Sequence, residues 1–226
     1  MLEDCIYNNP TPLLNIKNQY IIDIIDSYLP YSHGMEFECS QQSNYDEESF
    51  KKIPNIMEVK VDSYEQRYRI PSGLKGMVCL YDICNLMKDM SINNTESSTH
   101  YHTDLTDIWS EINVSGYRQQ PKGYDYITES LKEWETAFDY SKTANWWYFN
   151  DLGTLEVRIG EPTFDYNIII KRLMQCSDLC KQIRNIVPND YKLKQLQKQL
   201  QELNFFDELE IINQNQEIIN NKIIKW

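Results

Sequence analysis

The stretch Gly34-Met35-Glu36-Phe37-Glu38-Cys39 alternates apolar and acidic side chains with a period of two residues. Successive side chains of a β-strand point to opposite faces, so this alternation predicts a strand with both acids on one face. Such a strand suits a sheet that has one buried face and one polar face. That arrangement is typical of an antiparallel sheet.

Other stretches of the chain extend this pattern. Strands are predicted at Ile56–Asp62, Tyr64–Ile70, Thr99–Asp104, Asn145–Phe149 and Leu155–Ile159. Apolar residues at helical spacing predict helices at Asn15–Leu29, Leu74–Met87, Leu105–Ile112, Ile127–Phe138 and Tyr166–Val187. Because several strands follow one another directly, the sequence predicts an α+β fold, a curved antiparallel sheet with helices on one face.

The sequence divides into three parts. Residues 1–30 are expected to form an N-terminal arm or short helix, residues 31–188 the sheet domain, and residues 189–226 a helical tail. Pro188 is expected to end the long helix, because proline cannot continue the backbone hydrogen bonds. The tail is expected to pack on the body or to form a homo-oligomer, since its leucines have the spacing of a short heptad seam: Leu193, Leu196, Leu200 and Leu203.

Composition excludes several classes of partner. The 226 residues include 22 Lys and Arg against 34 Asp and Glu, a net charge of −12. This acidic balance argues against a nucleic-acid partner. No apolar run approaches the ~20 residues that span a bilayer, so no membrane partner is expected. The absence of CxxC pairs among six cysteines indicates reduced thiols, and the acidic N-terminus is unlike a signal peptide. Both favour the cytoplasm, or the host cytoplasm for a viral protein.

Charged side chains occur two residues apart in several predicted strands, and four of these rows are candidates for chemistry. Within each strand they share one face, and the residues between them are apolar or aromatic except Gln66. The rows are Glu36 and Glu38; Glu65, Arg67 and Arg69; His100 and His102; Glu156 and Arg158. The simplest assembly places all four rows on one exposed surface of the sheet.

Two interpretations of these rows stay open. They can form an ordinary solvated face, on which Glu and Arg pair between neighbouring strands. A plain solvated face would also use Thr, Lys, Ser and Gln, however, and adjacent carboxylates repel unless a cation or proton lies between them. Carboxylates with histidine suit Mg²⁺ or Mn²⁺, and arginines suit phosphate oxygens. The rows therefore predict a site for a metal and a nucleotide phosphate.

The order of the motifs resembles the amidoligase family, part of the glutamine synthetase and glutamate–cysteine ligase superfamily of carboxylate–amine ligases. The motifs are Gly-Met-Glu-Phe-Glu, an Arg-bearing strand with a Gly-containing break, His-Tyr-His, and Leu-Glu-Val-Arg before a long helix. Together they cover about residues 31–187. The resemblance implies a glutamine synthetase-like catalytic fold. It also implies ATP and Mg²⁺ or Mn²⁺ as cofactors.

The resemblance implies a role for each charged residue. The metal ligands would be Glu36, Glu38, His102 and Glu156. The nucleotide would be bound by Arg67, Arg69, His100 and Arg158, although either histidine could join the metal or the phosphates. Glu65 and Arg158 would take part in catalysis. In the implied reaction, ATP phosphorylates a carboxylate substrate and an amine displaces the phosphate from the acyl phosphate, which forms an amide between amino acids or peptides.

Two other functions stay open. The short chain and the leucine seam also suit a catalytically inactive ligase fold that serves as a structural or assembly protein. The abundance of Asn, Ile, Lys and Tyr resembles viral or AT-rich bacterial sequences, so such a protein would suit a virus. The weaker alternative is a metal-dependent hydrolase that uses His100 and His102.

Overall fold

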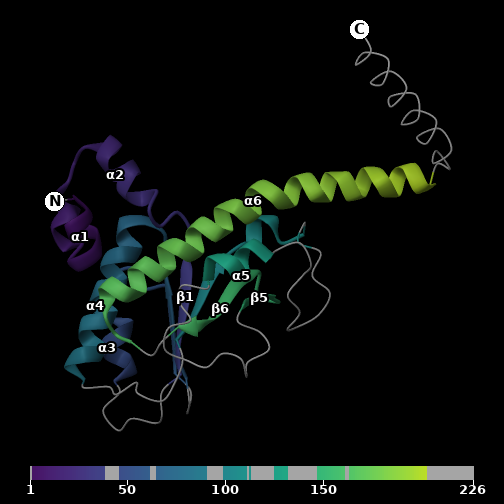
Figure 1. Cartoon of the computed structure of the whole chain (residues 1–226). Coiled ribbons are helices and arrows are strands. Elements are labelled where there is room, and N and C mark those ends of the chain that lie inside the picture. The colour runs from purple at the N-terminus through teal and green to yellow at the C-terminus, as the bar shows by residue number, and fades with distance from the viewer. Residues whose placement is uncertain are drawn as a thin grey trace. The chain divides into compact units, whose positions relative to one another are not determined.

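The structure, a computed structural model, describes residues 2–38, 46–61, 65–90, 99–110, 112, 125–131, 147–160 and 163–202 (Figure 1). The helices are α1 (Leu2–Asn8), α2 (Gln19–Asp26), α3 (Glu47–Lys51), α4 (Gly73–Asp89), α5 (Asp125–Leu131) and α6 (Tyr166–Glu202), with 3-10 helices η1 (Thr11–Asn15) and η2 (Thr106–Ile108). The strands are β1 (His33–Glu38), β2 (Glu58–Val61), β3 (Glu65–Ile70), β4 (Thr99–Asp104), β5 (Trp147–Asn150) and β6 (Thr154–Gly160). The chain forms two compact units, Met1–Ile183 and Arg184–Trp226.

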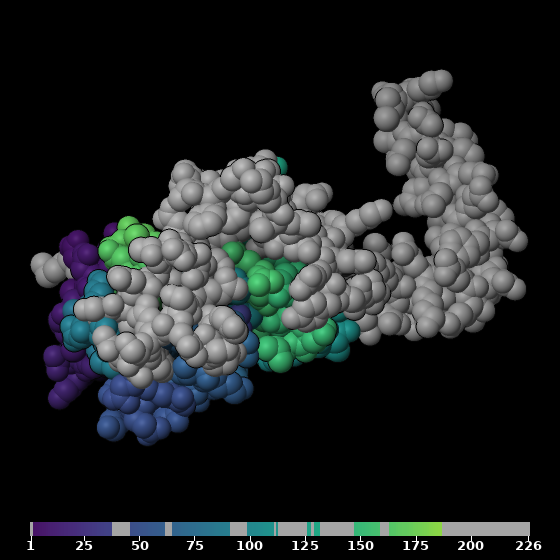
Figure 2. Space-filling model, turned by 90° about the horizontal axis from the view of Figure 1, so that it is seen from below, coloured from purple at the N-terminus to yellow at the C-terminus, as the bar shows by residue number. Residues whose placement is uncertain are grey.

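The described strands form one open sheet in the order β2-β3-β1-β4-β6-β5. Every neighbouring pair is antiparallel. The predicted α+β class with an antiparallel sheet is therefore confirmed. β1 and β4 lie at the centre, and β2 and β5 are the edges. In Figure 2 the segment that carries β2 (blue) lies apart from β5 and β6 (green), in keeping with this order.

One face of the sheet is apolar and packs against α4 and the start of α6 (Figure 1). Phe37 is fully buried and its ring lies 5.3 Å from that of Phe164, while the Tyr68 hydroxyl is 3.8 Å from the sulfur of Met87 on α4. The period-two pattern explains this face, because residues 35 and 37 alternate with the acids of β1.

His33 begins β1 on this same apolar face. The predicted strand begins at Gly34 and leaves His33 out, and that boundary is wrong. Its side chain is 1 % exposed, and its ring nitrogens lie 3.0 Å from the hydroxyl of Ser177 and 3.1 Å from that of Thr103. Burial disfavours the charged imidazolium and lowers the pKa of His33 to about 3. This histidine is thus a neutral, hydrogen-bonded part of the core.

The N-terminal helices belong to the first unit. The side chain of Asn18 accepts a hydrogen bond from the backbone of Tyr20, so it caps α2 later in the chain than the predicted start at Asn15. Asp26 Oδ1 accepts a hydrogen bond of 2.8 Å from the backbone N–H of Leu74, in the first turn of α4. The hydroxyl of Tyr166 donates to the carbonyl of Ile6 at 2.8 Å. These contacts join the N-terminal segment 2–30 to α4 and α6.

Three local features differ from the predicted elements. Glu47–Lys51 forms α3, where no helix is predicted, because the side chain of Asp46 caps it by accepting a hydrogen bond from the backbone N–H of Glu48. The helix predicted from Leu105 is present only as η2 among the described residues, since Asp104 accepts from Thr106 and closes a tight turn. The long helix does not end at Pro188 but continues to Glu202, so the helical context outweighs the hydrogen bond that proline cannot make.

The predicted leucine seam stays a prediction. Its first three leucines fall within α6, and their side chains, like residue 203, lie outside what the structure describes. Five cysteines are described and all are free thiols, as predicted. Within the described parts of the chain, no helix has the length and apolar character needed to cross a membrane.

Candidate metal centre

Strand register brings the predicted charged rows together. Glu36 lies opposite Arg67 on β3 and opposite His100 on β4, and His102 lies opposite Glu156 on β6. Directly opposed residues project from the same face of a sheet. The rows therefore share the face that α4 and α6 do not cover, as the sequence predicts.

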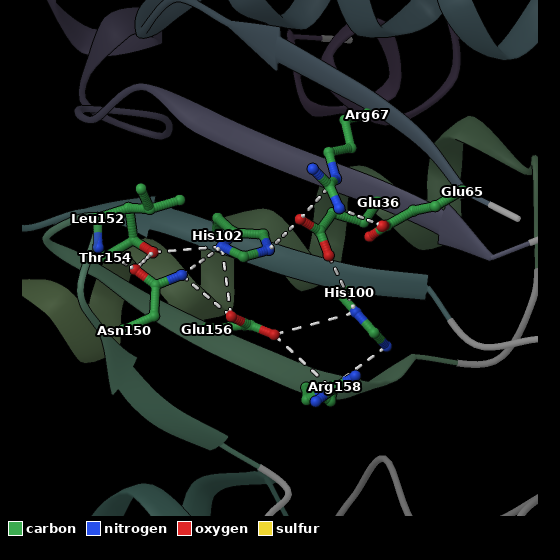
Figure 3. A network of polar contacts seen from close by, with 10 residues as sticks. All are labelled: Glu36, Glu65, Arg67, His100, His102, Asn150, Leu152, Thr154, Glu156 and Arg158. Carbon is green, nitrogen blue, oxygen red and sulfur yellow. Dashed lines mark hydrogen bonds and ion pairs between the residues drawn. The ribbon is translucent and has the colours of Figure 1, made fainter. Parts of the chain in front are cut away.

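The centre of this face is buried rather than exposed, which corrects the expected exposed surface. His100, His102 and Glu156 are only 3 %, 7 % and 4 % exposed. Such burial of charged groups is costly unless each has a partner. The partners form one connected network, drawn in Figure 3: Glu36, Glu65, Arg67, His100, His102, Asn150, Thr154, Glu156 and Arg158.

Two predicted residues are not among the members of this network that the structure describes. Arg69 stands on the same face, opposite Gly34, and is exposed. Glu38 lies opposite Glu65 in the register, but its side chain is outside what the structure describes. Its predicted role as a ligand stays a prediction.

Two groups of three side chains have the geometry to hold a cation, and Glu36 belongs to both. In Glu36, His102 and Glu156, one potential ligand atom from each lies within 4.8 Å of the others, and the same holds for Glu36, Glu65 and His100. The first group has His102 Nε2 at 3.3 Å from Glu36 Oε1. The second has His100 Nδ1 at 3.2 Å from Glu36 Oε2.

The two carboxyl groups of the second group differ in charge. Burial, followed by the neighbouring Glu36, raises the pKa of Glu65 to about 7. Burial acts in the same direction on Glu36, but the neighbouring side chains of His100, His102 and Glu65 outweigh it and hold the pKa of Glu36 well below its usual range. Close carboxylates share a site only with a proton or a cation between them. At neutral pH the pair therefore has a proton that a cation can replace.

Hydrogen-bond directions make His100 the poorer ligand. A guanidinium only donates, and Arg158 Nε lies 3.4 Å from His100 Nε2, so that nitrogen is an acceptor. The ring proton then lies on Nδ1 and points to Glu36. His100 links Arg158 to Glu36 in this arrangement, and it does not present a lone pair to the second group.

His102 has the opposite arrangement. The backbone N–H of Leu152 and the hydroxyl of Thr154 both donate to Asn150 Oδ1, at 3.0 and 2.9 Å, which fixes the direction of that amide. The Thr154 hydroxyl, with its proton so used, is an acceptor for His102 Nδ1 at 3.2 Å. Nε2 then has its lone pair toward Glu36 (Figure 3). This tautomer is assigned from the hydrogen-bond network.

One contact favours the other tautomer. Asn150 Nδ2 lies 3.2 Å from His102 Nδ1, besides donating to Glu156 Oε2 at 3.0 Å. A proton on Nε2, however, would be buried without an acceptor in hydrogen-bond geometry among the described residues. The assignment of a lone pair to His102 Nε2 avoids that cost. The lone pair and the carboxylate of Glu36 then face each other, an arrangement that a divalent cation stabilises. One imidazole and two carboxylates are suitable donors for Mn²⁺ and, less so, for Mg²⁺.

The arginines flank the carboxylates. Arg67 lies 3.4 Å from Glu36 through Nε and 2.5 Å from Glu65 through a terminal nitrogen. Arg158 Nε is 3.6 Å from Glu156, and its side chain is 36 % exposed. Both guanidinium groups therefore border the buried centre and remain accessible to an anion.

The sequence interpretation missed Asn150 and Thr154, which orient His102 and Glu156. They lie on either side of the turn at residues 151–153, which joins β5 to β6, and they oppose one another in the register. Thr154 is two residues before Glu156, so extending the charged row by one more position would have found it. Asn150 had no such signal, because it depends on the pairing of β5 with β6.

Comparisons of the chain with family models, curated proteins and solved structures give no match. The motif order and the geometry of this face are therefore the indications of function.

Proposed function

We propose that the protein is an ATP- and divalent-metal-dependent ligase that joins a carboxylate to an amine through an acyl phosphate. The observation that supports it is that Glu36 belongs to both potential cation-binding groups. Arg67 and Arg158 lie on either side of these groups. Transfer of a phosphoryl group requires this combination, because the oxygens of the nucleotide, the acceptor and the transferred group are all anionic.

Each residue has a defined task in this proposal. Glu36, His102 and Glu156 hold the cation, which when bound neutralises phosphate oxygens and aligns them for transfer. Arg158 binds the transferred phosphoryl group from the solvent side, and His100 keeps its guanidinium in place through the 3.4 Å hydrogen bond. Arg67 holds Glu36 and Glu65 and balances their charge.

Two buried cysteines behind the sheet are poor candidates for a covalent thiol route. Cys79 and Cys176 are buried in α4 and α6, and burial raises the pKa of each thiol to about 12. A thiol that stays protonated is a poor nucleophile. The ligase reaction needs no enzyme nucleophile, since the substrate carboxylate itself attacks the phosphate.

Calorimetric titration of the whole chain with Mn²⁺, with and without ATP, tests the proposal. We expect wild-type protein to bind Mn²⁺ and to release ADP when carboxylate and amine substrates from a panel of amino acids and peptides are added. Glu156→Gln keeps the shape of the side chain but should lose both properties. Glu48→Gln, at an exposed position on α3, is the matched control. Wild-type protein that binds neither Mn²⁺ nor ATP would refute the proposal.

One observation favours a second candidate, a catalytically inactive ligase fold with a structural or assembly role. The helix α6 continues through Pro188, so Leu193, Leu196 and Leu200 occupy successive turns of one helix, as an oligomer seam requires. Deletion of residues 190–226 should then reduce the size measured in solution. An unchanged monomer would exclude this candidate. Turnover without ATP would instead indicate the metal-dependent hydrolase.

A further inference from the structure

A cavity of about 330 Å³ opens on the charged face beside the metal centre. Its lining includes Gly34, Glu36, Lys60, Arg69, His102 and Asp104. The volume is at the small end of the ~300–1,000 Å³ typical of small-molecule sites. It therefore suits a small substrate better than a whole nucleotide.

Gly34 leaves room on one side of the cavity because it has no side chain. In the register Gly34 lies between Arg69 on β3 and His102 on β4. A Cβ atom at this position would stand 3.3 Å from the Cβ of His102, a tight contact. The glycine thus leaves a gap in an otherwise continuous row of side chains, and one wall of the gap is the metal-binding histidine.

The positively charged side chains around the gap differ in whether they already form ion pairs. Lys60 pairs with Glu58 at 2.5 Å, and Arg67 pairs with Glu36 and Glu65. Arg69, by contrast, makes no ion pair with any residue that the structure describes. The cation that the cavity offers to a ligand is therefore Arg69, whose planar guanidinium suits a carboxylate.

Asp104 adds an anion to the same cavity. It lies close enough to Arg69 for the two charges to interact, and yet the two side chains form no ion pair. Its carboxylate is held in position by the hydroxyl of Thr106 at 2.7 Å and that of Ser32 at 3.2 Å. A fixed anion and an available cation on one small cavity match a ligand that carries both charges.

We propose that this cavity binds the head group of a free α-amino acid, with its carboxylate on Arg69 and its ammonium group on Asp104. His102 lines the cavity, and its buried Nε2 has no hydrogen-bond partner among the described residues. A molecule bound in the cavity therefore lies next to the metal centre. The role of the bound amino acid as a reactant rests on the proposed ligase function, whereas its binding does not. Arg69, implied by the family resemblance to bind phosphate, is here a substrate residue.

Titration calorimetry of the whole chain with glycine, L-alanine, L-glutamate and L-lysine tests the proposal. Each is also added as its N-acetyl and its carboxamide derivative, and inorganic phosphate serves as a further probe. At least one free amino acid should bind, and both derivatives of it should bind about tenfold more weakly or worse, because each lacks one charged partner. Absence of binding by all four free amino acids would overturn the proposal.

Variants locate the site. Arg69→Gln should weaken binding about tenfold or more, Arg69→Lys should restore part of it, and Gly34→Ala should weaken it by filling the gap. Lys75→Gln removes an exposed positive charge from α4, on the other side of the sheet, and should change nothing. Phosphate binding of equal strength, with no loss on acetylation or amidation, would mean a general oxyanion site and would refute the proposal.

The same preparations separate the two proposals. Arg69→Gln should keep the Mn²⁺ affinity of the wild type, and Glu156→Gln should keep the binding of the free amino acid. If the wild-type protein binds a free amino acid but neither Mn²⁺ nor ATP, the ligase proposal is refuted and the cavity assignment is not. If it binds Mn²⁺ and ATP but no free amino acid, the cavity assignment is refuted and the ligase proposal is not.

Discussion

Replacing Thr154 with valine should weaken metal binding without touching a metal ligand. Valine keeps the branched shape but has no hydroxyl, so His102 Nδ1 loses its acceptor at 3.2 Å and Asn150 Oδ1 loses a donor at 2.9 Å. The hydrogen bond that holds the ring proton of His102 on Nδ1 is then lost. A proton on Nε2 would occupy the position that the cation needs.

The size of the effect follows from the hydrogen bonds. Loss of a partner that orients a metal-binding histidine typically costs 10–100-fold in metal affinity, and we expect about that loss here. The metal-free protein should also lose about 1–3 kcal/mol of unfolding free energy, because a buried polar group is left without a partner. Thr154→Ser restores the hydroxyl and should recover both quantities.

The assay is Mn²⁺ titration followed by electron paramagnetic resonance, with urea unfolding of the same samples. Thr163→Val is the matched control, because its hydroxyl accepts a backbone N–H of Asp165 at 3.0 Å, away from the metal centre. Wild-type Mn²⁺ affinity in Thr154→Val, in a protein whose Glu156→Gln variant has lost the ion, would refute the tautomer assignment. Failure of Thr154→Ser to recover affinity would refute it as well.

Two further predictions concern protons. The pKa of His33 is about 3 in the folded state against 6.5 ordinarily, so only the unfolded chain takes up this proton as the pH falls below about 6.5. The unfolding free energy should therefore fall by up to about 1.4 kcal/mol per pH unit from this group. Urea unfolding across that range should show a shallower slope for His33→Asn, and equal slopes would contradict the buried neutral state. The pKa of Glu65 is raised to about 7, so the folded state binds the extra proton and loses stability relative to the unfolded chain as the pH rises from about 4.5 through 7. Glu65→Gln removes this titration, and its thermal midpoint relative to wild type should rise above pH 7; a relative fall there would contradict the assignment.

Period-two alternation was sufficient to predict the strands and the shared charged face. It assigns each side chain to a face, because the backbone of a strand alternates strictly. The same rule would have placed His33 with Met35 and Phe37 in the core, had it been applied one residue earlier. The confirmed α+β class follows from the same pattern, while the glutamine synthetase-like identity of the fold stays a proposal.

Alternation does not reveal which strands are neighbours. The sequence placed Glu36 and Glu38 side by side as ligands, but the register puts Glu36 between Arg67 and His100, and Glu38 beside Glu65. The contacts of Asn150 with His102 and the gap at Gly34 depend on pairings between strands that are distant in the chain. Local helix propensity likewise does not predict that α6 continues through Pro188. The remaining residues of the helix stabilise it enough to outweigh one missing hydrogen bond.

The strand order has a consequence for synthesis of the protein. Among the described strands, Glu36 lies on the first to leave the ribosome and Glu156 on the last, so the group of Glu36, His102 and Glu156 is complete only when β6 has joined β4. A nascent or truncated chain that ends before residue 154 has two of these three potential donors and lacks the third. A cation held by all three would therefore add stability only to chains whose sheet has formed as far as β6.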